Sequence, residues 1–220
     1  MPDSLIDFNQ IEKTYGSERV LGPLSLSAAP GEIIGVISAN GAGKSTLLRI
    51  AAGVERPDRG SVRRPRFKAG EVGYVPQELA LYSSLTGLQN LRYWATAAGL
   101  RGKQKRVRCK YLLELVNLSD KANKPVSSYS GGMKRRLNLA CALVGSVKLL
   151  LLDEPTVGAD THSTELMLSA IESLRGSGCA VIIVSHHRDE IARLADRTVE
   201  LENGRIVSEN AAKAGAEAAL

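Results

Sequence analysis

Short apolar segments, separated by turns and by longer helical patterns, run through most of this chain of 220 residues. Continuous apolar runs at residues 149–152 and 180–184 are typical of strands that are covered on both faces within a parallel sheet. Further strands are predicted at residues 24–28, 33–37 and 72–75. Buried strands that alternate with helical patterns indicate an α/β fold.

Turn and helix signals connect these strands. Pro30-Gly31 predicts a turn between the first two of the shorter strands. A helix is expected over residues 45–52, directly after a loop that contains glycines. Near the C-terminus, strands at 197–201 and 205–207 flank Asn203-Gly204, which is the favoured turn pair of a hairpin.

The middle third of the chain, residues 78–147, has a helical pattern. One apolar helix face repeats at i, i+3, i+4 and i+7, through Leu137, Ala140, Cys141 and Val144. We therefore expect a helical subdomain that is inserted into a single domain of residues 1–209. The alanine-rich residues 210–220 are expected to form a tail, as a frayed helix or without order.

The net charge, the cysteines and the lengths of the apolar runs exclude few classes of function. The formal net charge of +6 suits nucleic acid, an anionic membrane face or phosphate ligands, and does not choose among them. Cys109, Cys141 and Cys179 form no C-x-x-C pair, so we expect buried thiols in a reducing compartment. With neither a signal-peptide pattern nor a run of about 18 apolar residues, we expect a soluble cytoplasmic protein. Any membrane crossing would then belong to a separate chain.

A glycine-containing loop between the strand at 33–37 and the helix at 45–52 predicts phosphate binding. Glycines let backbone N–H groups converge on a phosphate at a helix N-terminus, a lysine reaches the β- and γ-phosphates, and a hydroxyl ligates Mg²⁺. The predicted nucleotide-binding residues here are Ser38, Ala39, Asn40, Gly41, Ala42, Gly43, Lys44, Ser45 and Thr46. Ser38 stands where the motif G-x-x-x-x-G-K-[ST] has its first glycine, and binding should persist unless Ser38 requires a positive φ.

Two acids end the strand at 149–152. Asp153 and Glu154 lie at its carboxyl end, the edge at which α/β sheets bind ligands. Asp153 is expected to hold Mg²⁺ and Glu154 to polarise an attacking water as a general base.

Five segments in a fixed order resemble the nucleotide-binding subunit of ABC (ATP-binding cassette) transporters. They are residues 38–46, Gln77, Tyr129-Ser130-Gly131-Gly132-Met133, residues 149–154 and His186. The resemblance covers about residues 6–207. It implies a P-loop NTPase core with a mixed sheet and flanking helices, an N-terminal antiparallel β-subdomain and the inserted helical subdomain.

The resemblance also assigns roles within one subunit. Gln77 resembles the glutamine that senses Mg²⁺ and the attacking water, and joins Ser45 and Asp153 as a metal contact. His186 resembles the histidine that contacts the γ-phosphate, with His187 as the competing candidate. Tyr15 resembles the aromatic residue that stacks on adenine; its alternative is a core tyrosine at a strand edge. The implied catalytic set is Glu154, His186 and Lys44.

Other residues resemble those that contact the ATP held by a second subunit. Ser130, Gly131, Gly132 and Met133 open a predicted helix, for which serine is a suitable N-cap. Asp160 resembles a residue that crosses the dimer. By resemblance, two cassettes enclose two ATP molecules, as a homodimer or with a paired relative.

Met133 stands where many relatives have glutamine. A methionine at this position resembles the exporter branch, whose members pair with ABC-2-type membrane subunits. That implies an ATPase on the cytoplasmic face of the membrane, driving a separate transmembrane permease with ATP and Mg²⁺. One alternative is an ABC-type ATPase that acts on nucleic acid or ribosomes, though we expect no nucleic acid. A phosphate-loop kinase or GTPase would not account for the segment Ser130-Gly131-Gly132. Among exporters, a haem-export subunit is a further possibility, which agrees less well with Met133. The cargo is not encoded.

A basic run occupies residues 101–110 and contains no acid. It could bind anionic headgroups or nucleic acid, but we expect a solvated helix face. The other side of that helix is expected to carry the apolar residues Val107, Tyr111, Leu112 and Leu115.

Overall fold

Two sheets of different character form the strand half of the molecule. In the computed structural model, which describes residues 4–38 and 41–211, β1 (Ile6–Tyr15), β2 (Glu18–Ala28) and β4 (Arg59–Arg63) form an antiparallel sheet in the order β2-β1-β4. The core sheet has the order β5-β6-β7-β3-β8-β9. Its strands are β3 (Ile33–Ser38), β5 (Val72–Val75), β6 (Leu149–Asp153), β7 (Ala180–Val184), β8 (Arg197–Glu202) and β9 (Arg205–Ala211). Strands β5, β6, β7, β3 and β8 pair in parallel, and β9 pairs antiparallel to β8.

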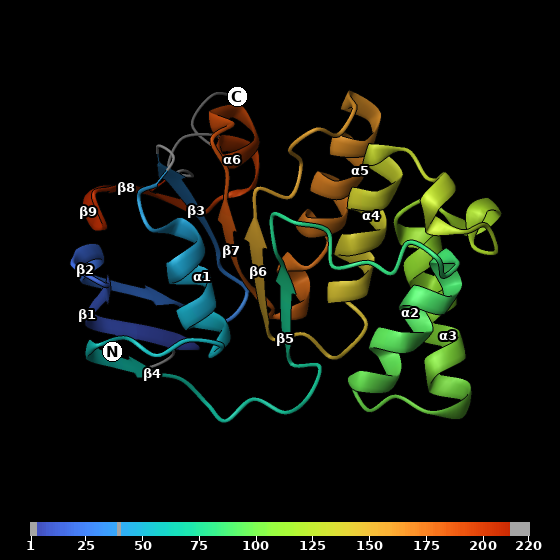
Figure 1. The fold of residues 1–220 in the computed structure, drawn as a ribbon, viewed down its shortest axis with the longest axis horizontal. Coiled ribbons are helices and arrows are strands. Elements are labelled where there is room, and N and C mark those ends of the chain that lie inside the picture. Colours follow the sequence, from blue (N-terminus) through green and yellow to red (C-terminus); the bar gives the residue numbers. More distant parts are fainter. Residues whose placement is uncertain (1–3, 39–40, 212–220) are drawn as a thin grey trace, which may run out of the picture.

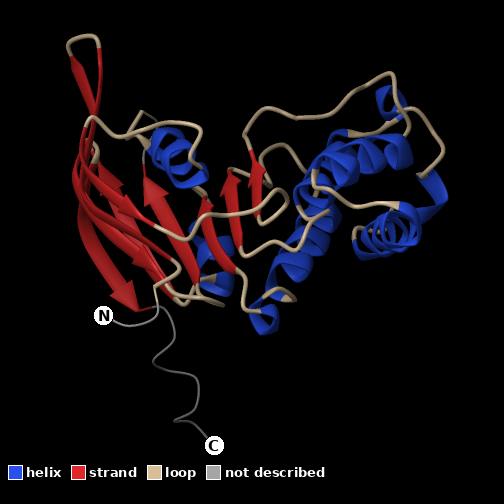
Figure 2. Ribbon diagram, turned by 90° about the horizontal axis from the view of Figure 1, so that it is seen from below, coloured by secondary structure: helices blue, strands red, loops and turns tan. Residues whose placement is uncertain are grey.

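Helices pack against the core sheet and extend beyond it. They are α1 (Lys44–Ala52), α2 (Gly87–Ala97), α3 (Gly102–Leu115), α4 (Gly131–Ala142), α5 (Thr161–Glu172) and α6 (Arg188–Leu194). Short 3₁₀ turns lie at Ser119–Lys121, Val126–Ser128 and Arg175–Ser177. Figures 1 and 2 show the antiparallel sheet and α1 at one end of the molecule, and the α2–α3 hairpin at the other.

The two faces of the core sheet belong to two different hydrophobic cores. Along β6, Leu149 and Leu151 pack with α1 and the antiparallel sheet, whereas Leu150 and Leu152 pack with the helical side. Every residue of β6 and β7 is buried. The apolar runs of the sequence are therefore strands covered on both faces, as predicted, and the α/β fold with its antiparallel subdomain and inserted helices is confirmed.

Some local predictions need correction. Pro30-Gly31 does form the predicted turn, and it joins β2 to β3, which belong to different sheets. The buried face of α4 contains Leu137, Ala140 and Cys141, while Val144 is buried just beyond the helix end at Ala142. Strand β9 includes residues 210 and 211, the first two of the predicted tail; residues 212–220 lie outside the described part.

The predicted orientation of α3 is only partly right. Val107 and Tyr111, which were expected on the apolar side, are 56% and 48% exposed. Leu112 is buried as predicted, and Cys109 and Leu113 complete the buried side. Arg108 explains part of this orientation, because its guanidinium donates to the carbonyl oxygens of residues 143–145 beyond the end of α4 (2.6–3.3 Å).

Candidate functional site

Four separate segments converge on one pocket at the carboxyl edge of the core sheet. Its volume is about 360 Å³. The lining residues are Val20, Gly41, Gly43, Lys44, Ser45, Thr46, Gln77, Asp153 and Glu154. Lys44, Ser45, Gln77, Asp153 and Glu154 were all singled out from the sequence, and the fold brings them together. Val20, at the start of β2, gave no signal in the sequence because only the packing of β2 against the loop places it there.

The loop before α1 has the backbone that phosphate binding requires. Gly43 has φ 93°, and a Cβ at this position would lie 2.5 Å from the carbonyl oxygen of Val20. Only glycine fits this position, which directly precedes the helix N-terminus. Ser38 ends β3 and is not among the described non-glycine residues with positive φ, so the serine imposes no left-handed strain here. Ala39 and Asn40 lie outside the described residues.

Lys44 is held at the base of the pocket. Its side chain is 8% exposed, and its Nζ donates to the carbonyl oxygen of Ser38 at 3.0 Å. The same Nζ lies 3.8 Å from Oε1 of Glu154. The cation therefore lies, in a buried setting, next to the carboxylate that the sequence predicts to be the base.

Glu154 adopts an unusual backbone conformation. Its φ is 49°, in the left-handed region that non-glycine residues rarely occupy. Such a conformation costs of order 1–3 kcal/mol and persists where the surrounding structure enforces it. Here it directs a carboxylate that is almost completely buried toward Lys44 on one side and His186 on the other.

His186 contacts Glu154 twice. Its Nδ1 lies 2.8 Å from Oε2 of Glu154, and its backbone N–H donates to the same oxygen at 3.3 Å. His187 stacks obliquely against His186, with 4.0 Å between the ring centroids. His187 is exposed, and no contact to Glu154 is found for it among the described residues. The geometry favours His186 of the two histidines.

Asp153 is buried, as Glu154 is. Burial raises its pKa, a hydrogen bond with the Ser45 side chain works in the opposite direction, and the charge of Glu154 raises it further. A carboxylate and a hydroxyl, with the amide of Gln77 in the same pocket, offer only oxygen ligands, the type that Mg²⁺ prefers. No group of three or more His, Cys, Asp or Glu in the described part could hold a metal alone. These residues fit a Mg²⁺ ion that is completed by the phosphates of a ligand.

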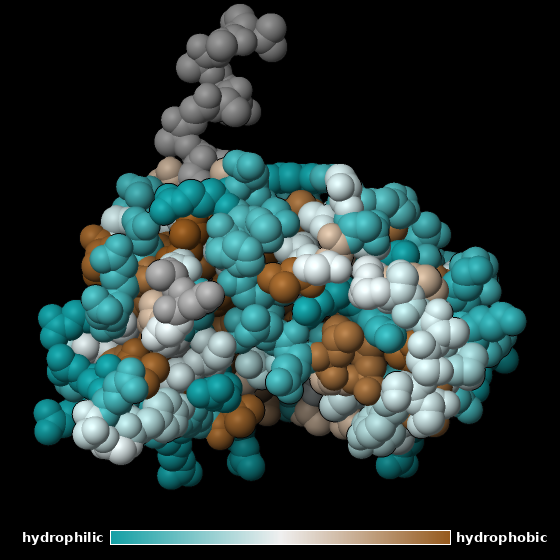
Figure 3. Space-filling model, turned by 45° about the horizontal axis from the view of Figure 1, so that its top comes forward, coloured by the Kyte–Doolittle hydropathy of each residue, from teal (hydrophilic) through white to brown (hydrophobic). Residues whose placement is uncertain are grey.

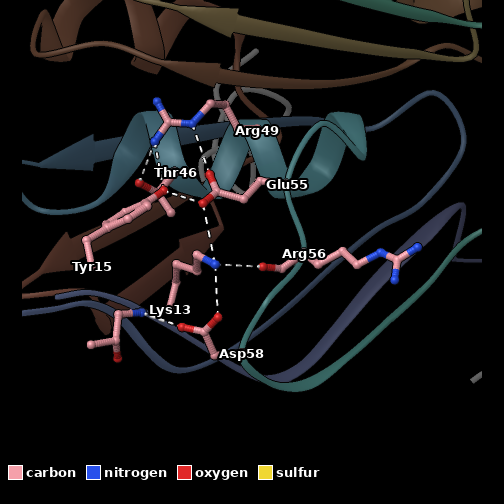
Figure 4. Close-up of polar contacts among 8 residues, drawn as sticks. Lys13, Tyr15, Thr46, Arg49, Glu55, Arg56 and Asp58 are labelled. Carbon is pink, nitrogen blue, oxygen red and sulfur yellow. Dashed lines mark hydrogen bonds and ion pairs between the residues drawn. The ribbon is translucent and has the colours of Figure 1, made fainter.

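Tyr15, at the end of β1, is 41% exposed and is therefore not a core residue. Figure 4 shows its hydroxyl within a polar cluster beside α1: it donates to Glu55 Oε1 at 2.6 Å and accepts from Arg49 Nη2 at 3.0 Å. Arg49 also donates to Thr46 Oγ1 of the phosphate loop at 3.1 Å. Lys13 ties Asp58 and the carbonyl of Arg56 into the same cluster. The ring is thus fixed relative to the phosphate loop, a link that sequence reasoning did not foresee.

The residues predicted to act across a dimer lie apart from this pocket, and none of them lines it. Ser130 caps α4 by accepting from the N–H of Met133 at 3.2 Å, as predicted. Asp160 caps α5 through Ser163. A Cβ on Gly132 would lie 2.3 Å from Ser163 Oγ, whereas one on Gly131 would meet only a carbonyl oxygen at 3.5 Å. Gly132 is therefore needed for helix packing, and Gly131 leaves an open helix N-terminus.

Arg135 connects these two regions. From the second turn of α4, its Nη1 donates to the carbonyl oxygen of Gln77 at 2.6 Å. Burial lowers the pKa of this guanidinium, as expected for a cation withdrawn from water. The segment that follows Ser130 and the glutamine of the pocket are thus joined by one hydrogen bond.

Comparison with known proteins gives one consistent result. The profile described as ABC transporter matches residues 21–157. The Nod factor export ATP-binding protein I of Paraburkholderia xenovorans (strain LB400) is 38% identical, over 97% of this chain and 73% of that protein. The linearmycin resistance ATP-binding protein LnrL of Bacillus subtilis (strain 168) is 34% identical, over 93% of this chain and 68% of that protein.

Solved structures agree in fold. A structure described as the ATP binding subunit of an ABC transporter superposes with a TM-score of 0.86 at 26% identity, over 94% of this chain and 90% of that one. A dimeric cassette in a post-hydrolysis state, bound to ADP and Pi, gives 0.87 at 24% identity, over 96% of this chain and 100% of that one. The second likeness concerns the fold alone.

Proposed function

This chain belongs to the ABC transporter family, and on that premise we propose that it is the ATP-binding and ATP-hydrolysing subunit of a membrane exporter. The observation that carries the proposal is the convergence of Lys44, Ser45, Gln77, Asp153 and Glu154 on one pocket. Export is named for the Paraburkholderia xenovorans relative and linearmycin resistance for the Bacillus subtilis one. An ATPase that acts on nucleic acid or ribosomes has no support from these relatives.

The proposed roles follow from position and charge. Lys44 and the N–H groups at the start of α1 bind the phosphates of ATP, and Tyr15 offers an aromatic face to the adenine ring. Ser45, Asp153 and Gln77 would hold Mg²⁺, which would neutralise developing charge on the phosphates when bound. Glu154 orients and deprotonates the attacking water, and His186 holds the Glu154 carboxylate in place.

ATP binding changes the surroundings of Glu154. Lys44 Nζ donates to the Ser38 carbonyl and lies 3.8 Å from Oε1 of Glu154. A bound γ-phosphate would compete for that cation and leave Oε1 of Glu154 available to a water.

We also propose that the complete site needs a second copy of the chain or a close relative. Ser130, Gly131 and Met133 present an open helix N-terminus that lines no part of the pocket around Lys44. Figure 3 turns the side with the carboxyl ends of the strands partly toward the viewer and shows mostly polar surface there, with several separate apolar groups. Two such faces placed head to tail would bring each open helix N-terminus, with Asp160, toward the other copy's phosphates.

We propose that a transmembrane permease binds to a second surface of this chain. No helix of residues 4–38 and 41–211 has the length and apolar character that crossing a bilayer requires. A mostly apolar cavity of about 370 Å³ lies beside the edge strand β5, between α2 and α4. Buried Asn138 Nδ2 and Trp94 Nε1 are donors without a partner in the described part, and both residues line it. A helix end of a transmembrane permease, with its unpaired carbonyls, would satisfy them at the cytoplasmic face of the membrane.

A Glu154→Gln variant tests the proposed chemistry. The amide keeps the size of the side chain but cannot accept a proton, so the variant should bind ATP and dimerise yet hydrolyse at least about 100-fold more slowly. Size-exclusion chromatography with ATP and a phosphate-release assay give the two readouts. Normal turnover in this variant would show that Glu154 is not the base.

A further inference from the structure

The outward side of α3 combines exposed apolar side chains with unusual basic density. Between Glu78 and Glu114 the chain contains no acid. Its basic residues there are Arg92, Arg101, Lys103, Lys105, Arg106, Arg108 and Lys110. This hairpin of α2 and α3 forms the end of the molecule farthest from the antiparallel sheet (Figure 1).

A line of side chains along α3 faces solvent. Lys103, Val107 and Tyr111 are spaced at i, i+4 and i+8, so they share one stripe of the helix. All three are exposed, although Val107 and Tyr111 are apolar or aromatic. We call this surface the α3 outer face. It is a shallow hollow lined by Leu100, Lys103, Gln104, Val107, Arg108 and Tyr111.

The cations near this hollow differ in their hydrogen-bond and ion-pair partners. Arg108 is withdrawn into hydrogen bonds with carbonyls beyond α4, Lys105 donates to Thr96 Oγ1 at 3.0 Å, and Lys110 pairs with Glu114 at 3.6 Å. Arg101, Lys103 and Arg106 are exposed and have no acidic partner within the described residues. Three cations therefore lie beside an apolar strip with no acid of residues 4–38 and 41–211 paired to them.

We propose that the α3 outer face binds the surface of an anionic phospholipid bilayer. Cations that flank apolar and aromatic side chains on one helix face are the pattern of interfacial helices, in which headgroups meet the cations and the apolar side chains enter the acyl boundary. The face extends along α3, which has 14 residues and is about 21 Å long. Nucleic acid is less favoured, because the hollow holds one aromatic ring, which Arg108 already covers at 5.4 Å.

This contact goes beyond ATP hydrolysis. It predicts that the chain associates with lipid without any permease, and it would orient the cassette before a membrane subunit docks. Because each basic residue near an anionic surface contributes about a fivefold change in binding, reversing two of them should be easy to measure.

Vesicle sedimentation with the full chain tests the proposal. The probes are phosphatidylcholine vesicles with and without about one third phosphatidylglycerol, at low and at physiological salt. The charge variant is Lys103→Glu with Arg106→Glu. The matched control is Arg56→Glu with Arg59→Glu, two exposed arginines at the opposite end of the molecule that give the same change in net charge. Figure 4 shows the Arg56 guanidinium extending away from the polar cluster.

We expect binding to the anionic vesicles to be at least about tenfold tighter than to the neutral ones, with a tenfold or greater loss in the charge variant and less than a twofold loss in the control. Val107→Ser with Tyr111→Ser should weaken binding while leaving its salt dependence unchanged. Equal losses in the charge variant and the control would overturn the proposal, because binding would then follow net charge alone. Tighter binding to an RNA oligonucleotide than to vesicles would also overturn it. Circular dichroism melts verify that each variant is folded.

Discussion

His186 Nδ1 lies 2.8 Å from Oε2 of Glu154, and the backbone N–H of His186 donates to the same oxygen. An ionised carboxylate only accepts hydrogen bonds, so in a contact with ionised Glu154 the donor would be Nδ1, and Nε2 would be the ring atom that can face a ligand. The strand ends of β6 and β7 bring the two residues together across 32 positions of sequence.

This relationship predicts a strong effect of His186→Ala on hydrolysis. Without the imidazole, the Glu154 carboxylate loses its orienting partner and can turn fully toward Lys44, so turnover should fall by about 100-fold or more. ATP binding should change much less. Steady-state phosphate release measures the first effect, and nucleotide titration the second.

His187→Ala is the matched control, since His187 is the adjacent exposed histidine and no contact joins it to Glu154. Its turnover should stay within about threefold of the wild type. If the two variants behaved alike, the histidine assignment would be wrong.

Much of the site could be predicted from the sequence because the roles lie in short contiguous segments. The loop at residues 38–46 and the acids after residue 152 are each bound to a strand end, and parallel strands place their carboxyl ends at one edge. The left-handed conformation of Glu154 and the cluster around Tyr15 could not be foreseen, since both depend on contacts between distant segments.

Strands β1 and β4 were not predicted from their own residues, and the reason is again contacts between distant segments. Strand β4 is exposed at four of its five residues, and β1 mixes buried and exposed positions without regular alternation. Their extended conformation is stabilised by pairing with each other and with β2, not by their own apolar pattern. In helix α3, the apolar residues are spread over a wide part of the helix circumference. The hydrogen bonds of Arg108 influence which of these residues are buried.

Asp153→Asn should stabilise the nucleotide-free protein. Burial raises the pKa of Asp153, so ionisation costs the folded state more than the unfolded chain. That cost is absent below the unfolded-state pKa of about 3.9 and grows as the pH rises through the raised folded-state value.

The measurement is the melting temperature of both proteins without ligand. Asp153→Asn should melt about 2 °C or more above the wild type at pH 7, and this gain should shrink toward pH 4. With ATP and Mg²⁺ the order should reverse, because the variant loses a metal ligand. A lower melting temperature for the ligand-free variant at pH 7 would contradict the role of burial.

Tyr15→Ala should weaken ATP binding about tenfold through loss of an aromatic face for the base. Tyr15→Phe keeps the ring but loses the hydroxyl contacts to Glu55 and Arg49, so it should have an intermediate effect. Binding of inorganic tripolyphosphate, which has no base, should be unchanged in both. A matching loss of tripolyphosphate binding would show that Tyr15 acts on the phosphate loop instead.

The adjacent glycines of α4 separate packing from function. Gly132→Ala should destabilise the fold by about 1–3 kcal/mol, because the added methyl would meet Ser163 and Asp160. Gly131→Ala should leave the melting temperature nearly unchanged yet lower ATPase activity, since it fills the open helix N-terminus. Denaturant unfolding and phosphate release distinguish the two, and full activity in folded Gly131→Ala would contradict the contact across the dimer.

We propose that ATP is hydrolysed at a site completed by a second cassette. Steady-state ATPase activity with Mg²⁺, measured against protein concentration beside Lys44→Ala and Ser130→Ala, tests it most directly. We predict activity that rises faster than linearly with concentration and is lost in both variants. Activity that is linear in concentration, or that survives Ser130→Ala, would contradict the dimeric site and leave a monomeric phosphate-loop ATPase.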